Sequence, residues 1–149
     1  MSDSNALEIL VVEDNAQDLE LMLRALRKAN FANRMQVARD GAEALDMIFG
    51  ETGFAGKGGA APKVILLDLK LPKVDGLAVL QKLKVDERTR NIPVVVLTSS
   101  KEQRDVVESY RLGVNSYIVK PVNFERFAAA VQELGLYWLL LNQPPKIDA

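Results

Sequence analysis

Three carboxylate side chains stand where apolar segments of strand length end. Asp68 follows the run Val64 to Leu67, and Glu13 and Asp14 follow the run Ile9 to Val12. A buried strand is normally apolar to its end, and the carboxyl ends of neighbouring parallel strands share one ligand crevice. We therefore expect the three acids to form one cluster, and such a cluster favours a hard cation such as Mg²⁺.

A hydroxyl and an ammonium group occupy the same type of position. Thr98 follows the run Ile92 to Leu97, and Lys120 follows the run Tyr117 to Val119. Taken alone, Thr98 could be an ordinary strand-end hydroxyl and Lys120 a solvated lysine. The acids could likewise be helix caps or turn residues. In one parallel sheet they would all face one crevice, which supplies the groups needed to move a phosphoryl group. On this interpretation Asp68 is the nucleophile that forms an aspartyl phosphate.

The order of elements that positions these residues predicts an α/β fold with a doubly wound, five-stranded parallel sheet. Apolar runs of strand length alternate with segments of helical period, and such alternation implies right-handed crossovers with helices on both faces. The first and third strands then flank the topological switch point, which puts Asp14 beside Asp68. The five predicted strands are Ile9–Val12, Met35–Ala38, Val64–Leu67, Ile92–Leu97 and Tyr117–Val119.

Polar residues and glycines mark the ends of the predicted helices. Asn15, Asp40 and Ser100 have the sequence context of N-caps, the last two with Glu or Gln three residues later, and Gly113 suits the end of a helix. The segment 50–62 has five glycines and two charged residues, so we expect a mobile surface loop. Its Gly-Lys pair does not complete a phosphate-binding loop, because Gly58 stands where Ser or Thr is needed.

Composition excludes several other classes of protein. The 149 residues, 48% hydrophobic and 26% charged, suit one domain spanning residues 1–149. A formal charge of −1 gives no general reason to bind nucleic acid or an anionic membrane, and the absence of Cys and His excludes thiolate sites and histidine catalysis. No apolar segment reaches the length of about 18 residues expected of a membrane helix, and no signal peptide begins the chain. We expect a cytoplasmic protein whose partners are proteins.

The chain resembles the receiver domains of two-component response regulators from about residue 8 to residue 134. The resemblance implies a flavodoxin-like sheet with strand order 2-1-3-4-5 and an Mg²⁺ ion. It also implies that Asp68 accepts phosphate from the phosphohistidine of a partner histidine kinase and loses it by hydrolysis, so that the protein catalyses only its own phosphorylation and dephosphorylation. The separations of Thr98 and Lys120 from Asp68 match the family as well. The matching motifs are Glu13-Asp14, Asp68, Leu71-Pro72, Asp75-Gly76, Thr98 and Lys120-Pro121.

The resemblance also assigns roles to single residues. The backbone carbonyl of Lys70 would complete the metal shell formed by the three acids, while the lysine side chain at this position departs from the family pattern. Tyr117 would swing inward when Thr98 is drawn toward the phosphoryl group. A Gly/Lys-rich insert before the third strand and the Tyr137-Trp138 pair resemble stand-alone receivers that are paired with phytochrome-type histidine kinases.

The last apolar segment, Leu136 to Leu141, predicts an extended C-terminal helix that needs a partner. It is apolar on all sides, and one core cannot bury every side of it. We expect the extension, residues 134–149, to meet the same segment of a second subunit across a two-fold axis, with Tyr137, Trp138 and Leu141 at the contact of a homodimer. The alternative is a helix end that folds back on its own domain.

Other interpretations fit parts of the pattern. A phosphatase with an aspartyl nucleophile would have a second acid two residues after Asp68, where Lys70 stands. A receiver-like dimerisation module without phosphotransfer would lack the acceptor, a metal-binding acid or the lysine, and all are present. A phosphorelay intermediate and a terminal regulator share the same residues, so both remain open. We expect no DNA-binding domain, so that the output is protein contact.

Overall fold

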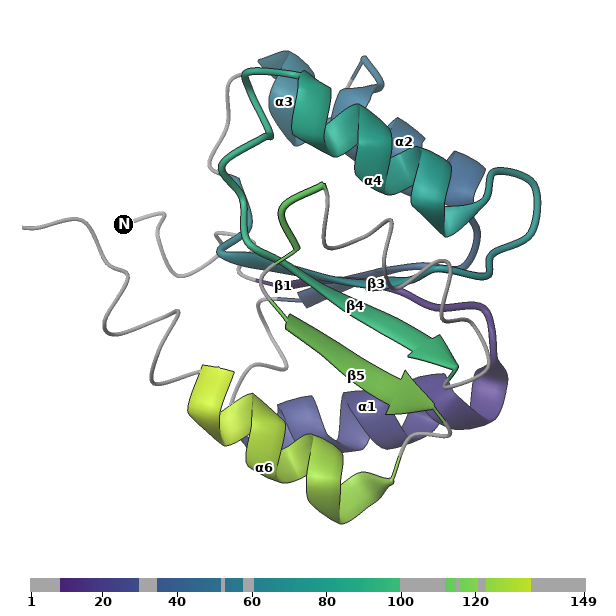
Figure 1. Cartoon of the computed structure of the whole chain (residues 1–149), viewed down its shortest axis with the longest axis vertical. Helices are drawn as coiled ribbons and strands as arrows, with labels where there is room; N and C mark the ends of the chain where they lie inside the picture. Colours follow the sequence, from purple (N-terminus) through teal and green to yellow (C-terminus); the bar gives the residue numbers. More distant parts are fainter. Residues whose placement is uncertain are drawn as a thin grey trace, which may run out of the picture.

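The computed structural model describes residues 9–29, 35–51, 53–57, 61–99, 112–114, 116–120 and 123–134. Its centre is a five-stranded sheet in the order β2-β1-β3-β4-β5, and all strand pairs are parallel (Figure 1). The chain therefore has the predicted doubly wound α/β fold, with β1 next to both β2 and β3 at the switch point. The strands are β1 Ile9–Val12, β2 Met35–Ala38, β3 Val64–Asp68, β4 Val94–Ser99 and β5 Ser116–Lys120.

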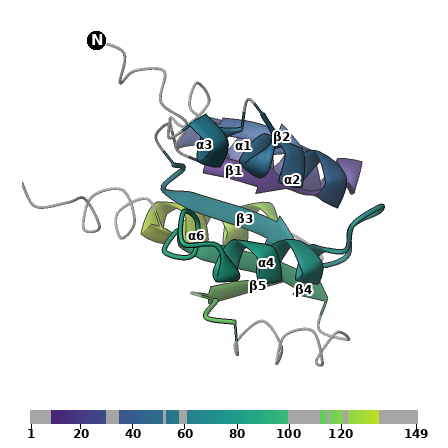
Figure 2. The same ribbon diagram turned by 90° about the horizontal axis from the view of Figure 1, so that it is seen from above.

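Helices cover both faces of the sheet, as Figures 1 and 2 show. One face carries α1 (Ala16–Lys28) and α6 (Phe124–Leu134), and the other carries α2 (Gly41–Phe49), α3 (Phe54–Lys57) and α4 (Gly76–Val85). None of the helices in the described ranges is long and apolar enough to span a membrane.

Strand β1 shows how the two layers fix the sheet. Leu10 and Val12 pack with α2 and α4, whereas Ile9 and Val11 pack with α1 and α6. All four side chains are buried, because alternate residues of a strand face opposite sides and both sides are covered by helices. Helix α6 joins the second of these clusters through Phe127, which is buried there. A strand that is held from both sides fixes the position of the residues that follow it.

The predicted helix caps are confirmed where the structure describes them. Asn15 Oδ1 accepts the N–H of Asp18 at 2.8 Å, and Asp40 Oδ1 accepts the N–H of Glu43 at 2.7 Å. Glu43 completes the capping arrangement by accepting the N–H of Arg39, one residue before the cap, at 2.9 Å. Gly113 has a positive φ of 84°, as expected of a helix-ending glycine, but the helix predicted after Ser100 lies outside the described residues.

The prediction of a mobile surface loop at residues 50–62 is wrong for the part that the structure describes. Gly53 is buried, residues 54–57 form α3, and Phe54 and Ala55 pack against the core cluster beneath α2 and α4. The apolar content of the segment is low, but one ring and one methyl group that pack against the core help to hold a single helical turn.

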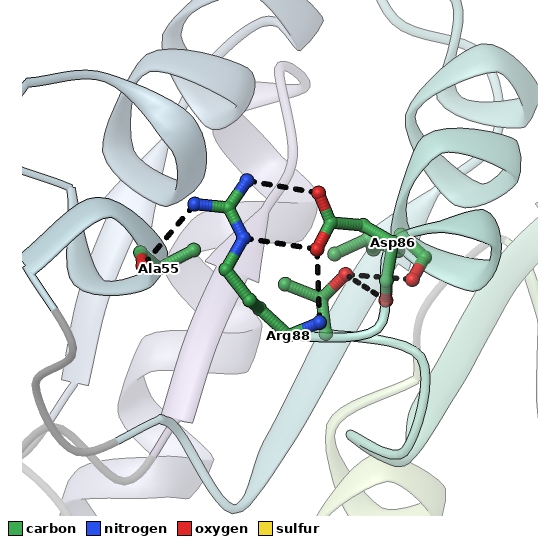
Figure 3. Close-up of polar contacts among 5 residues, drawn as sticks. Ala55, Asp86 and Arg88 are labelled. Carbon is green, nitrogen blue, oxygen red and sulfur yellow. Dashed lines mark hydrogen bonds and ion pairs between the residues drawn. The ribbon is translucent and has the colours of Figure 1, made fainter.

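Arg88, in the connection between α4 and β4, anchors this turn from outside (Figure 3). Its guanidinium donates to the carbonyl oxygen of Ala55 at 3.4 Å and lies 5.6 Å from the centre of the Phe49 ring. It also makes two parallel hydrogen bonds to the Asp86 carboxylate, at 3.0 and 2.9 Å. Hydrogen bonds from Arg88 lower the pKa of Asp86 to about 2. Arg88 thus joins α3 to the end of α4.

Candidate functional site

The structure brings Glu13, Asp14 and Asp68 together, as the sequence predicts. Each offers one carboxylate oxygen, and these oxygens all lie within 4.8 Å of one another. The pairing of Val12 with Leu67 explains the meeting, because the residues that follow β1 lie beside the last residue of β3. Glu13 is 0% and Asp68 2% exposed, whereas Asp14 is exposed. The cluster therefore has two buried members and one that faces solvent.

Backbone groups hold the two buried carboxylates in place. The N–H of Asn15 donates to Glu13 Oε2 at 3.0 Å, and the N–H of Lys70 donates to Asp68 Oδ1 at 3.1 Å. The adjoining main chain is fixed in turn by neighbouring strands, since the N–H of Glu13 donates to Ala38 at the end of β2. Both acids are thus oriented by main chain that continues the sheet, which favours one arrangement of their oxygens.

The start of α4 lies directly behind Asp68. The N–H of Gly76 donates to the carbonyl oxygen of Leu69 at 2.9 Å. A Cβ atom at position 76 would come within 2.1 Å of the Asp68 carbonyl oxygen and 2.6 Å of Leu69 Cα. Only glycine fits such a close approach of two backbone segments, which gives a physical reason for the glycine that begins this helix.

The donor set fits a divalent cation. Three carboxylates at this spacing repel one another, and two of them are withdrawn from water, so a cation that accepts oxygen ligands removes an electrostatic cost of folding. Carboxylate and carbonyl oxygens are the protein ligands that hard cations prefer. Glu13, Asp14 and Asp68 would hold the ion, and Lys70, whose N–H already contacts Asp68, has its carbonyl in the same loop.

The strand register places the backbone of the other predicted residues at the same edge. Asp68 pairs with Leu97, so Thr98 is the next residue along β4, and Lys120 is the last residue of β5. Tyr117 lies further back on β5, beside Val96. The side chains of Thr98, Lys120 and Tyr117 lie outside what the structure describes, as do the whole residues Tyr137, Trp138 and Leu141.

Residues at the start of α2 contact the loop that follows Asp68, and the sequence prediction does not include them in the site. A Cβ atom at Gly41 would lie 1.8 Å from the carbonyl oxygen of Val74, in the loop between β3 and α4. Lys73 in this loop has a positive φ of 70°, and its ammonium lies 3.5 Å from the Asp40 carboxylate. Asp40-Gly41 and Pro72-Lys73 are recognisable turn pairs, but nothing in their order along the chain shows that they meet.

Strand-end acids at the switch point of a doubly wound sheet are the groups that a metal-assisted phosphoacceptor domain needs. In agreement, residues 9–132 match the family described as the response regulator receiver domain. The chain belongs to this family, whose members are signalling modules, and the resemblance inferred from the motifs is confirmed.

Solved structures of response regulators have the same fold. The bacteriophytochrome response regulator RtBRR is 53% identical, with a TM-score of 0.74, over 95% of this chain and 85% of its own. The phosphorylated cyanobacterial phytochrome response regulator RcpA is 35% identical, with a TM-score of 0.77, over 95% of this chain and 99% of its own. The Mn²⁺-bound form of Rcp1, from Synechocystis sp., is 36% identical, with a TM-score of 0.75, over 93% of this chain and 99% of its own.

Proposed function

We propose that this protein is a stand-alone response regulator that accepts a phosphoryl group on Asp68 from the phosphohistidine of a histidine kinase. The observation that carries the proposal is the meeting of Glu13, Asp14 and Asp68 within 4.8 Å at the carboxyl edge of the sheet. Family membership supports the chemistry. The relative RcpA, of whose chain the match covers 99%, is described as phosphorylated. Residues 1–149 act as one receiver domain in this proposal.

Each residue of the site has a role that follows from its chemistry. Glu13, Asp14, Asp68 and the carbonyl of Lys70 would hold Mg²⁺, which would offset negative charge on the transferred group. An oxygen of Asp68 attacks phosphorus and forms the acyl phosphate, and the bond to the donor nitrogen breaks. Thr98 donates a hydrogen bond to the transferred group and Lys120 balances its charge. The protein acts on itself only, and hydrolysis of the acyl phosphate restores Asp68.

Incubation with acetyl phosphate and Mg²⁺ tests this assignment directly. The native chain should acquire one phosphoryl group, measured by intact-mass spectrometry at low pH, and lose it in base as an acyl phosphate does. Asp68→Asn should acquire none. Asp46→Asn, which removes an exposed carboxylate on α2, is the matched control and should be labelled like the native chain. Full labelling of Asp68→Asn would remove Asp68 as the acceptor.

The kinase partner is proposed to be of the phytochrome type, in the cytoplasm where such kinases use ATP. The support is the 53% identity to RtBRR, described as a bacteriophytochrome response regulator, together with the insert before β3. Phosphotransfer from a purified phytochrome-type kinase should be at least tenfold faster than from a histidine kinase of another sensor class. Equal rates from both kinases would count against this partner.

We also propose that residues 134–149 form the contact of a homodimer, with Tyr137, Trp138 and Leu141 at its centre. The support is the apolar run 136–141, which is too apolar on all sides to be covered by one domain. In this proposal the signal passes to other proteins by direct contact. The switch is a change in the rotamer of Tyr117 as Thr98 moves. The double variant Trp138→Asp with Leu141→Asp should have half the native mass in analytical ultracentrifugation. A native chain that is already monomeric, or a double variant of unchanged mass, would contradict the dimer.

A further inference from the structure

The loop between β3 and α4, at the carboxyl edge of the sheet (Figure 1), contains a strained turn. Lys73 has a φ of 70°, and the N–H of Val74 donates to the carbonyl oxygen of Pro72 at 2.8 Å. A hydrogen bond that spans three residues around a positive φ defines the rare and strained form of the γ-turn. A lysine adopts this conformation only where the surrounding structure holds it there.

Contacts with the start of α2 hold this turn. The N–H of Gly41 donates to the same carbonyl oxygen of Pro72 at 3.2 Å, and Lys73 Nζ lies 3.5 Å from Asp40 Oδ2. Asp40 is itself fixed, because its other oxygen accepts the N–H of Glu43 as the cap of α2. The side chain of Asp40 is 17% exposed and that of Lys73 is 68% exposed. One end of the ion pair is therefore rigid, and it restrains the flexible end.

The fixed points of the loop lie on either side of Lys70. At the base of the loop, the N–H of Gly76 is bonded to the carbonyl oxygen of Leu69, and at its tip Pro72 and Lys73 are bonded to α2. Between base and tip, Lys70 donates its N–H to Asp68. Two residues between two fixed points have little freedom, so a change at the tip alters the direction of the Lys70 carbonyl.

We propose that Lys73 is a positioning residue whose ion pair with Asp40 holds the carbonyl of Lys70 in the direction that a divalent cation needs. This inference rests on the proposed function, because it assumes that the cation binds at the acid cluster. Lys73 does not touch the cation or the phosphoryl group, and it acts through the main chain of the loop. A largely exposed ion pair contributes little to global stability, so its effect should be concentrated in the loop that it restrains.

Isothermal titration calorimetry with MgCl₂, on the full chain without any phosphodonor, tests this role. Lys73→Met removes the ammonium and keeps an unbranched side chain, and Asp40→Asn removes the charge and keeps an oxygen that can cap α2. Each should raise the dissociation constant for Mg²⁺ by about two- to fivefold, the range set by an exposed ion pair. Lys73→Arg, which keeps the cation, should bind Mg²⁺ as the native chain does. Lys28→Met, at the end of α1, is the matched control for loss of a surface lysine and should also be unchanged.

The double variant separates positioning from a general loss of charge. If the two residues act as one pair, Lys73→Met combined with Asp40→Asn should bind Mg²⁺ no more weakly than either single variant. The inference would be overturned if the increase in the dissociation constant of the double variant were the product of the two single increases. It would also be overturned if Lys73→Met left the dissociation constant unchanged, or if Lys73→Arg did not bind Mg²⁺ as the native chain does. A native chain that shows no Mg²⁺ binding would instead overturn the proposed function, so the two failures are distinguishable.

Discussion

Replacing Asp68 with Asn tests the electrostatics of the acid cluster. Glu13 and Asp68 are both buried, and their nearest cluster oxygens lie within 4.8 Å. At an effective dielectric constant of about 20, two unit charges at that separation repel by about 3 kcal/mol. The Asn side chain retains an oxygen for the N–H of Lys70, so this hydrogen bond can survive. Without a divalent cation, loss of this repulsion should raise the free energy of unfolding. We expect a net rise of only about 1 to 2 kcal/mol, because the substitution also removes other contacts of the carboxylate.

In saturating Mg²⁺, the native chain should instead be more stable than Asp68→Asn. A cation that binds only the folded chain adds about 2.7 kcal/mol to the free energy of unfolding at one hundred times its dissociation constant. Asp68→Asn should gain far less, because a carboxylate ligand is gone. Urea unfolding followed by circular dichroism, in EDTA and in saturating Mg²⁺, measures both effects. Asp46→Asn serves again as the control and should match the native chain in both conditions.

Two results would refute this reasoning. If Asp68→Asn is less stable than the native chain in EDTA, repulsion within the cluster is not a cost of folding. If Mg²⁺ stabilises Asp68→Asn as much as the native chain, the cation does not bind at the cluster. Either result would require another explanation for the burial of Glu13 beside Asp68.

Three further perturbations have defined outcomes. Gly76→Ala should lower the free energy of unfolding by about 1 to 3 kcal/mol and slow labelling by acetyl phosphate, because its Cβ meets the Asp68 carbonyl; an unchanged urea midpoint would contradict the close approach. Phe127→Ala, at a side chain 1% exposed, should cost about 3 to 5 kcal/mol in the same assay, and a loss below 1 kcal/mol would show that α6 is not packed as described. The lowered pKa of Asp86 means that its contacts with Arg88 stabilise the fold fully above about pH 4 and are lost as the pH falls toward 2. The stability difference between the native chain and Asp86→Asn should shrink over that range, and a constant difference would exclude the ion pair as its source.

The sheet was predictable because its signals are local. The strands β1 and β2 have the predicted limits, since each apolar run is bounded by polar residues. Strand β4 begins at Val94 rather than at the predicted Ile92, because Ile92 donates its N–H to Thr89 in the preceding turn and Pro93 has no N–H to donate. The meeting of the strand-end acids followed from strand order alone, which is why the cluster could be predicted with the fold.

The insert and the loop beside the site could not be predicted in the same way. Helix α3 depends on Arg88, which lies 33 residues away from its partner Ala55, and on the packing of Phe54. The pair of Lys73 with Asp40 likewise joins a loop to a helix from a different βα unit. Short elements and single ion pairs depend on tertiary contacts that composition and periodicity do not encode.

The direction of α6 determines how the molecule can be tethered. This helix runs back along the sheet, so it ends at the edge where the strands begin, whereas Asp68 lies at the end of β3 on the opposite edge (Figure 1). A chain immobilised on a surface just beyond α6 would hold its acids toward the solution. Two copies joined at that end would likewise leave both acceptors within reach of separate kinase molecules.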